Sequence, residues 1–379
     1  MHLRVQDFIA TSVNDEAPPE TFDAIALDIA RHQAVHVPAV GRLFGSRGRD
    51  LLKTASVREL PALPTDVFRL TRVAAHPPAD DVVVFRTSGT TSGARGEHPL
   101  STTATYEAGA LAWGRWALFF DVPRPEFVIA LAPPRGTSSG DSSLHFMMHA
   151  FAAELAGEAG THGGDSLAGA APRASFLQPS PDELAKPGDL ARAVGDASKR
   201  GAPVLLMGAS FAFVHLLDAL GNERLVLPPG SRIMHTGGFK GRSREVAPGE
   251  LRARMAGMFG VAESAVVGEY GMTELSSQLY EGTLRAARGL ATPSGQHGVF
   301  VAPPWLRVAA AHPDTLDPLP EGETGILRFE DLANVDSALI VQTADRGRCR
   351  ASTVELLGRA PGAVPRGCSL TVEELMGRP

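Results

Sequence analysis

Short apolar runs alternate with amphipathic stretches through the middle of the chain. The apolar runs hold five or six residues each, a length typical of strands buried on both faces of a sheet. The segments between them repeat apolar residues at helical spacing, and helical character is expected again from Glu274. The expected strands are 81–85, 127–132, 203–208, 231–236 and 265–270, and the expected helices are 142–155, 211–220 and 243–259. This alternation predicts an α/β fold with a doubly wound, mainly parallel sheet.

The two ends of the chain carry other patterns. Residues 20–56 place Phe22 and Ile29 on one helical face, which predicts a helical N-terminal region packed on the main domain. Beyond residue 297, strand-like runs such as TGILRF and SALIVQ predict a small β-rich subdomain. Residues 161–202 are rich in Gly, Ala, Pro and Asp, and we interpret them as a long insertion or surface region. The expected division is a helical region at 1–80, an α/β core at 81–297, a β-rich subdomain at 298–357 and a hinge-like tail at 358–379.

The composition indicates a globular chain without nucleic-acid or membrane partners. The 379 residues are 44% hydrophobic and 21% charged, which is enough apolar surface to bury a large core. A net charge of −6 argues against a nucleic-acid partner, because a basic face is needed to neutralise phosphates. No apolar run reaches the length of a membrane span, and the N-terminus lacks the features of a signal peptide. Two cysteines, Cys349 and Cys368, imply no disulfide framework, so we expect a cytoplasmic protein.

A loop rich in hydroxyls and glycines follows the first expected strand. Residues 87–96 read TSGTTSGARG, in which glycines let backbone N–H groups converge on an anion and the arginine neutralises phosphate charge. The loop is no Walker motif, because Gly-x-x-x-x-Gly-Lys is absent, and an ordinary surface loop is the alternative. The candidate phosphate-binding residues are Thr87, Ser88, Gly89, Thr90, Thr91, Ser92, Gly93 and Arg95.

Three further motifs come later, each close to an expected strand. Residues 235–240 read HTGGFK, residues 268–274 read GEYGMTE and residues 342–347 read QTADRG. We expect GEYGMTE to end a strand and open a helix, at the sheet edge where ligands collect and helix N-termini favour anions. A turn explains the glycine pair equally well, and a glutamate in a first helical turn often only compensates the helix dipole. The sequences LGR at 357–359 and RGCSLTVEEL at 366–375 follow.

In this order, the motifs resemble those of the adenylate-forming superfamily, which includes acyl-CoA synthetases, adenylation domains and luciferases. Its phosphate signature is Thr-Ser-Gly-Thr-Thr-Gly-x-Pro-Lys-Gly, and Ser92, Ala94 and Arg95 here replace a glycine, the proline and the lysine. Arginine keeps the positive charge of that lysine. The resemblance implies ATP and Mg²⁺ as cofactors and makes 81–297 a nucleotide-binding core. The implied contacts are Gly237 and Gly238 beneath adenine, Tyr270 with Gly271 and Met272 beside it, Thr273 on the α-phosphate, Glu274 on Mg²⁺ and Asp345 on the ribose.

Within this superfamily, the chain resembles the acyl-protein synthetases, the long-chain fatty-acid–luciferin-component ligases of bacterial fatty-acid reductase complexes. That family activates a fatty acid as acyl-AMP and loads it onto a cysteine near the C-terminus, and Cys368 lies in the matching segment. In the superfamily, a mobile C-terminal domain supplies a lysine, whereas this sequence stops soon after the hinge motif and has no lysine after Lys240. The resemblance therefore implies that this domain is missing and that Lys240, Arg95 and Arg359 are candidate cations.

The expected activity is ATP-dependent activation of a carboxylic acid, followed by acyl transfer to a thiol. The expected catalytic residues are Cys368, Lys240, Arg359 and Thr273, and Cys368 could instead be a buried, inert cysteine. An aryl- or acyl-CoA or carrier-protein ligase and a non-catalytic nucleotide-binding scaffold are the alternatives, with CoA, a carrier protein or another acyl-acceptor protein as partner. Residues 136–140 match the hydrolase motif Gly-x-Ser-x-Gly, but two prolines at 133–134 interrupt the strand that such a nucleophile needs.

Overall fold

The computed structural model describes residues 1–14, 16–87, 94–121, 124–134, 141–157, 173–177, 187–238 and 243–359. Its helices are α1 (His2–Val13), α2 (Phe22–His36), α3 (Pro38–Ser46), α4 (Ala104–Ala117), α5 (Ser143–Ala156), α6 (Pro187–Lys199), α7 (Ser210–Leu220), α8 (Pro248–Phe259) and α9 (Thr283–Ala287). Its strands are β1 (Leu63–Pro64), β2 (Val83–Arg86), β3 (Glu97–Leu100), β4 (Phe127–Leu131), β5 (Ala174–Phe176), β6 (Val204–Ala209), β7 (Arg232–Thr236), β8 (Val266–Tyr270), β9 (Leu279–Glu281), β10 (Val299–Val301), β11 (Leu306–Ala311), β12 (Thr324–Asp331), β13 (Ile340–Arg350) and β14 (Thr353–Arg359). No helix in these ranges is long and apolar enough to cross a bilayer.

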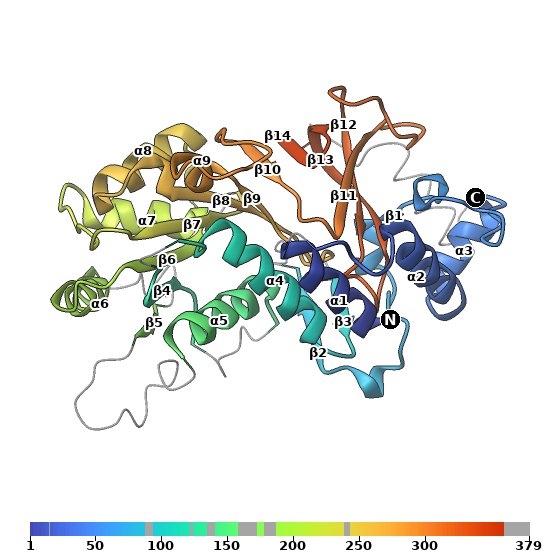
Figure 1. Ribbon diagram of the computed structural model, residues 1–379, viewed down its shortest axis with the longest axis horizontal. Helices are drawn as coiled ribbons and strands as arrows, with labels where there is room; N and C mark the ends of the chain where they lie inside the picture. Colours follow the sequence, from blue (N-terminus) through green and yellow to red (C-terminus); the bar gives the residue numbers. More distant parts are fainter. Residues whose placement is uncertain are drawn as a thin grey trace.

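One large mixed sheet runs through the molecule (Figure 1). Within the described residues it holds twelve strands, in the order β11-β12-β13-β14-β10-β9-β8-β7-β6-β4-β5, with β1 paired to β13. The strands β5, β4, β6, β7 and β8 are parallel, and from β8 to β11 each strand runs antiparallel to its neighbour in that order. The α/β class is therefore confirmed, but the run of neighbouring parallel strands is limited to one half of the sheet. In the other half, among the described residues, only the two-residue strand β1 pairs in parallel, with β13.

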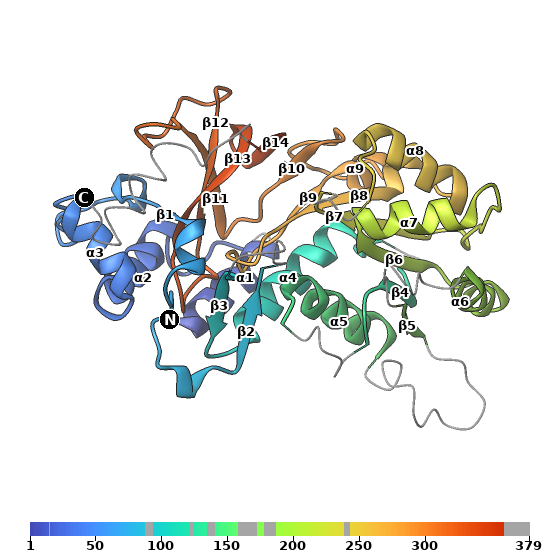
Figure 2. The ribbon, with the colours of Figure 1, turned by 180° about the vertical axis from the view of Figure 1, so that it is seen from behind.

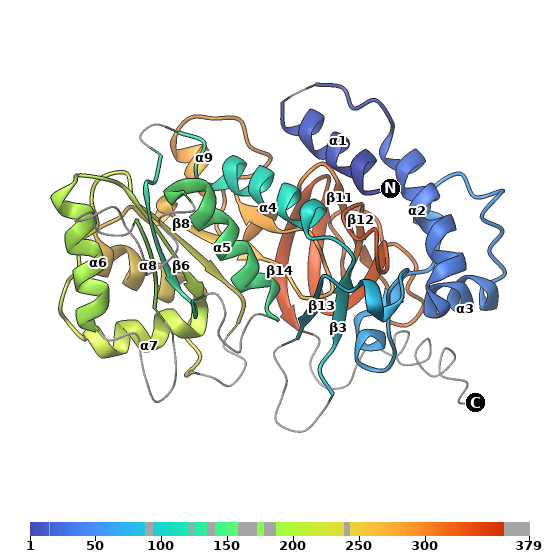
Figure 3. The same cartoon turned by 90° about the horizontal axis from the view of Figure 1, so that it is seen from below.

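Helices cover both faces of the parallel half. Successive residues of a strand point to opposite faces, so on β7 Met234 joins a core shared with α4 and α5, whereas Ile233 joins a second core formed with α6, α7 and α8. Figure 3 shows α4 and α5 side by side, and Figure 1 shows α7 and α8 on the other side of the strands. The expected doubly wound arrangement is confirmed for this half.

Of the N-terminal helices, α2 and α3 pack against the antiparallel half and α1 packs against α4. α1 lies against α4, and α2 and α3 lie beside β1 at the end of the molecule far from α6 (Figure 2). The buried Gln33 of α2 donates to the Asn334 carbonyl oxygen at 2.7 Å and accepts from the Leu339 N–H at 2.8 Å. Helices occupy 22–36 and 38–46, so the helical pattern expected over 20–56 is confirmed up to Ser46, and residues 47–56 form turns and irregular structure instead.

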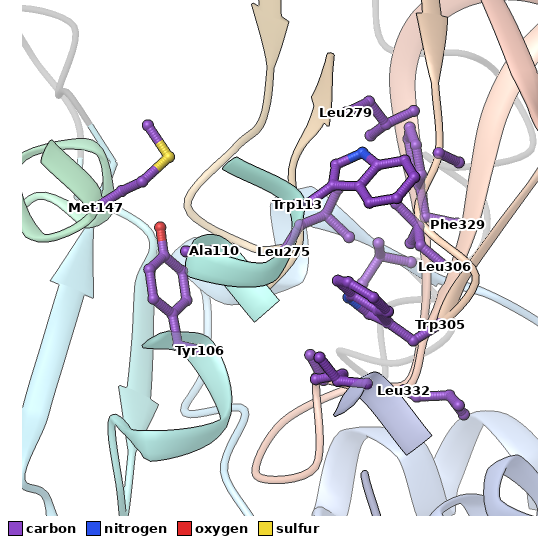
Figure 4. Packing of buried hydrophobic residues seen from close by; sticks show 14 of the residues in the cluster. Tyr106, Ala110, Trp113, Met147, Leu275, Leu279, Trp305, Leu306, Phe329 and Leu332 are labelled. Carbon is purple, nitrogen blue, oxygen red and sulfur yellow. The ribbon is translucent and has the colours of Figure 1, made fainter. Parts of the chain in front are cut away.

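Two tryptophans pack where the two halves of the sheet meet (Figure 4). Trp113 of α4 meets the fully buried Trp305 edge to face, with 5.8 Å between the ring centroids. The Trp113 indole N–H donates to the Val301 carbonyl oxygen at 3.2 Å, and the Trp305 N–H donates to Ser277 Oγ at 3.1 Å. Because both buried N–H groups have acceptors, the two rings contribute their apolar area to the core without a desolvation penalty.

Two expectations about the middle of the chain were wrong in part. The strand expected at 81–85 lies at Val83–Arg86 and pairs antiparallel with β3 in a separate two-stranded sheet. The stretch 161–202, expected to be an insertion or surface region, contributes β5 to the edge of the large sheet. It also contributes α6, whose apolar face (Leu190, Val194 and Ala197) belongs to the second core.

No helix opens at Glu274. The chain turns at 271–278 and returns as β9, antiparallel to β8. The Asp331 carboxylate accepts from the Ser276 N–H at 3.0 Å and from Ser277 Oγ at 2.7 Å. These side-chain contacts give the segment partners other than a helical ladder, and serine and aspartate often compete with helix formation in this way. The anion-favouring helix N-terminus expected here is therefore absent.

Candidate functional site

The carboxyl ends of β7 and β8 form a shared edge of the parallel half. Thr236, the last residue of β7, is paired with Glu269 of β8, so the residues that follow each strand lie next to one another. Gly237 has a φ of +70°, a left-handed conformation that favours glycine, and both Gly237 and Gly238 are exposed. Bare backbone therefore follows β7 at the edge of the sheet where Tyr270 ends β8.

Tyr270, Asp345 and Arg359 converge although they are far apart in sequence. The Tyr270 hydroxyl donates to Asp345 Oδ2 at 2.8 Å, and Arg359 Nε donates to Asp345 Oδ1 at 3.1 Å. Asp345 and Arg359 are partners in the β13–β14 ladder, which explains their proximity. The Tyr270 ring stacks on Phe329 at 5.8 Å between centroids, and burial, with the Asp345 charge second, raises the Tyr270 pKa well above its usual value. The phenol therefore stays a hydrogen-bond donor.

Glu269 is a buried carboxyl directly before Tyr270. It is 6% exposed, and Thr236 Oγ1 donates to its Oε2. Burial raises the pKa of Glu269 to about 7, and the Thr236 hydrogen bond opposes that shift. A Cβ at Gly271 would lie 2.5 Å from Glu269 Oε1, so any larger residue there would displace the carboxyl group. The strand edge thus holds a carboxyl able to gain or lose a proton near neutral pH.

The turn that carries Thr273 and Glu274 is held by polar side chains from other elements. His98 Nδ1 lies 2.7 Å from the Thr273 carbonyl oxygen, and Asn334 Nδ2 donates to the Glu274 carbonyl oxygen at 3.0 Å. Glu274 itself is 8% exposed. Asp331 holds the following residues, as described above. Burial raises the pKa of Asp331 to about 6, and its hydrogen bonds oppose that shift.

The base of the hydroxyl-rich loop is closed by backbone and side-chain contacts. The Thr87 N–H donates to the Gly96 carbonyl oxygen at 3.0 Å, and the Gly96 N–H donates to Thr87 Oγ1 at 2.8 Å. Arg95 donates from Nε to the Thr87 carbonyl oxygen at 2.6 Å and from Nη1 to Asp141 Oδ2 at 2.7 Å. Arg95, expected as a phosphate-binding cation, is thus engaged by a carboxylate at the loop base.

The comparisons with known proteins address the fold. No family model matches the chain. It is similar to an open conformation of 2-hydroxyisobutyryl-CoA ligase in complex with 2-HIB-AMP and CoA, with a TM-score of 0.59 and 15% identity, over 91% of this chain and 75% of that one. The same ligase in its thioesterification state gives a TM-score of 0.59 and 17% identity, over 89% and 67%. The chain therefore shares the fold of 2-hydroxyisobutyryl-CoA ligase over most of its length.

Two further similarities cover less of the known proteins. ATP-bound MatB from Rhodopseudomonas palustris gives a TM-score of 0.48 and 18% identity over 75% of this chain and 49% of that one. The long-chain-fatty-acid–luciferin-component ligase of Vibrio harveyi is 32% identical over 79 residues, which are 19% of this chain and 21% of that protein. The chain thus spans about half the length of MatB, and its match to the Vibrio protein is local.

Several residues assigned to the adenylate-forming motifs lie outside the described residues. These are Ser88 to Gly93 of the loop, Lys240 and Cys368. Cys349 is described, and it is buried, with a pKa that burial raises to about 12, so it acts as an inert packing residue. Among the described residues, no three metal-binding side chains gather into one cluster.

Sequence reasoning missed the groups that support the adenylate-forming motifs. Glu269 lies inside the motif GEYGMTE. A glutamate near the end of a strand expected to be buried was the sequence signal that could have identified it. The only signal for His98 in the sequence was its position two residues after Gly96; it lies in β3, where three of the four residues are buried. Asp331 and Asn334 carried no local signal for this role, because the residues of the turn that they hold lie more than 50 residues away.

Proposed function

We propose that this chain activates a carboxylic acid with ATP, forms an acyl-adenylate and transfers the acyl group to a thiol. The observation that carries the proposal is the convergence of Tyr270, Asp345 and Arg359 beside the glycines that follow β7. The motif resemblance assigns these positions to one nucleotide. The adenylate-forming fold supports the same reaction class, since 2-hydroxyisobutyryl-CoA ligase has been solved with 2-HIB-AMP and CoA.

In this proposal the nucleotide lies across the carboxyl ends of β7 and β8. Each Asp345 carboxylate oxygen accepts one hydrogen bond from protein and can accept another, so the ribose hydroxyl groups can donate to it. Adenine would lie between Tyr270 and the backbone of Gly237 and Gly238. Mg²⁺ would be held by the Glu274 carboxylate together with phosphate oxygens and water, a common way for proteins to bind this ion, and it would neutralise phosphate charge.

The proposed reaction has two displacement steps. A carboxylate oxygen of the acid attacks the α-phosphorus of ATP, the bond to the bridging oxygen breaks, and pyrophosphate leaves. A thiolate then attacks the acyl carbon, and AMP leaves with the electron pair of the broken carbon–oxygen bond. The protein contributes position and charge: Thr273 contacts the α-phosphate, and Arg359 and Lys240 are the cations that balance the developing charge.

We propose a fatty acid as the substrate and Cys368 as the first acceptor thiol. The local match to the Vibrio harveyi ligase and the motif around Cys368 support this choice. CoA or a carrier-protein thiol is the second candidate acceptor, supported by the adenylate-forming ligase that was solved with CoA.

Acid-dependent exchange between ATP and labelled pyrophosphate tests the activation step. A panel of short, long-chain and aromatic acids should show exchange with at least one acid, and the largest rate should come from a long-chain fatty acid. Binding of ATP without exchange for any acid would replace the proposal with the nucleotide-binding scaffold.

The convergence of side chains is tested by Tyr270→Phe and Asp345→Asn. Tyr270→Phe keeps the ring on Phe329 and removes one hydrogen bond to a charged group, worth about 1.5 kcal/mol or more, so the KM for ATP should rise about tenfold. Asp345→Asn should raise it further, because Arg359 also loses its partner. Asp314→Asn, at an exposed aspartate of the same half of the sheet, is the control and should change nothing. An unchanged KM in both site variants would remove Asp345 from the nucleotide site.

Cys368→Ala separates activation from transfer. Pyrophosphate exchange should persist in this variant, whereas covalent labelling of the chain by a radioactive acid and ATP should disappear. Cys349→Ala, at a buried cysteine, is the matched control and should keep the label. Labelling that survives Cys368→Ala would assign the acceptor role to another thiol.

A further inference from the structure

His98 connects the base of the hydroxyl-rich loop, which ends at Gly96, with the turn that carries Thr273. It is part of β3, two residues after Gly96, where the loop closes. The side chain is 1% exposed, and the Phe68 ring meets the imidazole edge to face at 5.7 Å. A buried imidazole needs polar partners, because a ring nitrogen without one has lost its hydrogen bonds to water and destabilises the folded state.

Both ring nitrogens of His98 have a partner, and the chemistry of the partners determines the tautomer. Nδ1 lies 2.7 Å from the Thr273 carbonyl oxygen, which can only accept, so Nδ1 carries the proton and donates. Nε2 is then the acceptor, and the Ser337 hydroxyl at 2.7 Å donates to it. Burial lowers the pKa of His98 to about 4, so the neutral ring persists at neutral pH. A single neutral tautomer satisfies both contacts.

The contacts of His98 connect three segments that the candidate site needs together. β3 leaves the loop base at Gly96, the turn presents Thr273, and Ser337 belongs to the segment that also sends Asn334 to the Glu274 carbonyl oxygen. Two neighbouring carbonyl groups of the turn are therefore held by side chains from outside it. A shift of β3 would move the turn in the same direction, because the hydrogen bond of 2.7 Å between His98 Nδ1 and the Thr273 carbonyl oxygen tolerates only a small change in length.

We propose that His98 is a positioning residue that fixes Thr273 and Glu274 relative to the base of the hydroxyl-rich loop, at Thr87 and Gly96. It acts through the Thr273 backbone and touches no reactant. Its kinetic consequence rests on the proposed function, because Thr273 and Glu274 are the groups assigned to the α-phosphate and Mg²⁺. Displacing such groups by about 1 Å can cost on the order of 10²-fold in rate.

A pair of amide substitutions separates the two contacts of the ring. Asn places its amide nitrogen where Nδ1 lies, so His98→Asn keeps a donor for the Thr273 carbonyl oxygen. Gln reaches the position of Nε2, so His98→Gln keeps an acceptor for Ser337 and loses the donor to Thr273. Ser337→Ala is the matched control, because it removes the other partner and leaves the Nδ1 contact intact.

The primary measurement is hydrogen–deuterium exchange of the peptide covering 271–278 in the full chain, which requires no catalytic activity. We expect wild type, His98→Asn and Ser337→Ala to keep its protection and His98→Gln to lose it. In the pyrophosphate exchange assay, His98→Gln should lower kcat on the order of 10²-fold, with His98→Asn within about threefold of wild type.

Equal effects of His98→Asn and His98→Gln on both measurements would overturn the proposal, since a role in packing alone treats the two amides alike. Loss of protection at 271–278 in Ser337→Ala relative to wild type would also overturn it. This comparison needs neither His98 variant, so it decides the matter if both of them fail to fold. Absence of exchange activity in the wild-type chain would contradict the proposed function, while the deuterium result would still decide the role of His98.

Discussion

Burial makes ionisation of the Glu269 carboxyl group, at the edge of the sheet, unfavourable in the folded chain. It is buried before Tyr270, with Thr236 as its hydrogen-bond donor, and its pKa is about 7 in the folded chain against an ordinary value of 4.5. The folded chain therefore holds a proton between these two pH values that the unfolded chain has lost. Stability falls as pH rises through this window, because the folded state binds more protons there.

Glu269→Gln should remove this pH dependence. Each pKa unit corresponds to about 1.4 kcal/mol, so the wild type should lose about 3 kcal/mol of unfolding free energy relative to the variant between pH 4.5 and pH 8. Urea unfolding of both proteins at several pH values measures the difference. Glu263→Gln, at an exposed glutamate, is the control and should follow the wild type. Parallel stability curves for wild type and Glu269→Gln would show that the carboxyl is ionised in the folded chain.

At the scale of elements, the turn after β8 depends on Asp331. This carboxylate at the end of β12 accepts hydrogen bonds from Ser276, Ser277 and Ala333 and is fully buried. Asp331 supplies hydrogen-bond acceptors that backbone carbonyl groups would supply in a helix. The turn therefore needs no helical hydrogen bonds, and the chain continues as β9. The loop geometry at the candidate site is therefore set by a strand of the antiparallel half.

Asp331→Ala should destabilise the chain by about 3 kcal/mol, since it leaves several buried donors without an acceptor. Chemical denaturation measures this loss. Ser277→Ala should cost less, and the double variant should be less destabilised than the sum of the two, because both changes remove the same hydrogen bond. Strict additivity would mean that the Ser277–Asp331 contact contributes no stability.

Some helices and strands of the fold could be predicted from the sequence, and others could not. β4, β6, β7 and β8 were predicted because strands buried on both faces are continuous apolar runs. The antiparallel pairing of β2 with β3 was not predicted, because a half-buried strand of a hairpin and a short parallel strand have similar compositions. The helix expected from Glu274 failed because the decisive partner, Asp331, is remote in sequence.

At the scale of the whole molecule, the N-terminal helices are connected to the candidate site. Gln33 of α2 binds the Asn334 and Val335 carbonyl oxygens and the Leu339 N–H. Asn334 in turn holds the Glu274 carbonyl oxygen. Helix α2 therefore supports the turn through one intermediate segment.

Gln33→Ala should destabilise this segment first. It leaves two buried carbonyl oxygens and one N–H without partners, which should cost about 3 kcal/mol. Thermal unfolding and deuterium exchange of peptides covering 334–339 measure the effect, and protection at 271–278 should fall with it. Gln296→Ala, at an exposed glutamine, should leave both unchanged. Loss of protection confined to α2 would show that the helix does not support the turn.

The candidate site was predictable where motifs were contiguous and unpredictable where it depends on tertiary contacts. Tyr270, Asp345 and Arg359 were each named from local motifs, and the sheet brings them within hydrogen-bond distance. The contact of Arg95 with Asp141 depends on where the loop base meets another segment, and no local pattern encodes it.

The end of β14 has a consequence for how a thiol could meet the bound acid. Arg359 is bonded to Asp345, so the chain leaves the sheet directly beside the proposed ribose contact. Cys368 follows nine residues later, and a fully extended span of that length reaches about 30 Å. A thiol of the same chain meets the acyl-adenylate without a second molecule, so its rate of reaction does not depend on how dilute the protein is. Self-acylation should therefore be first order in protein, whereas transfer to a separate carrier or CoA would depend on the concentration of that acceptor.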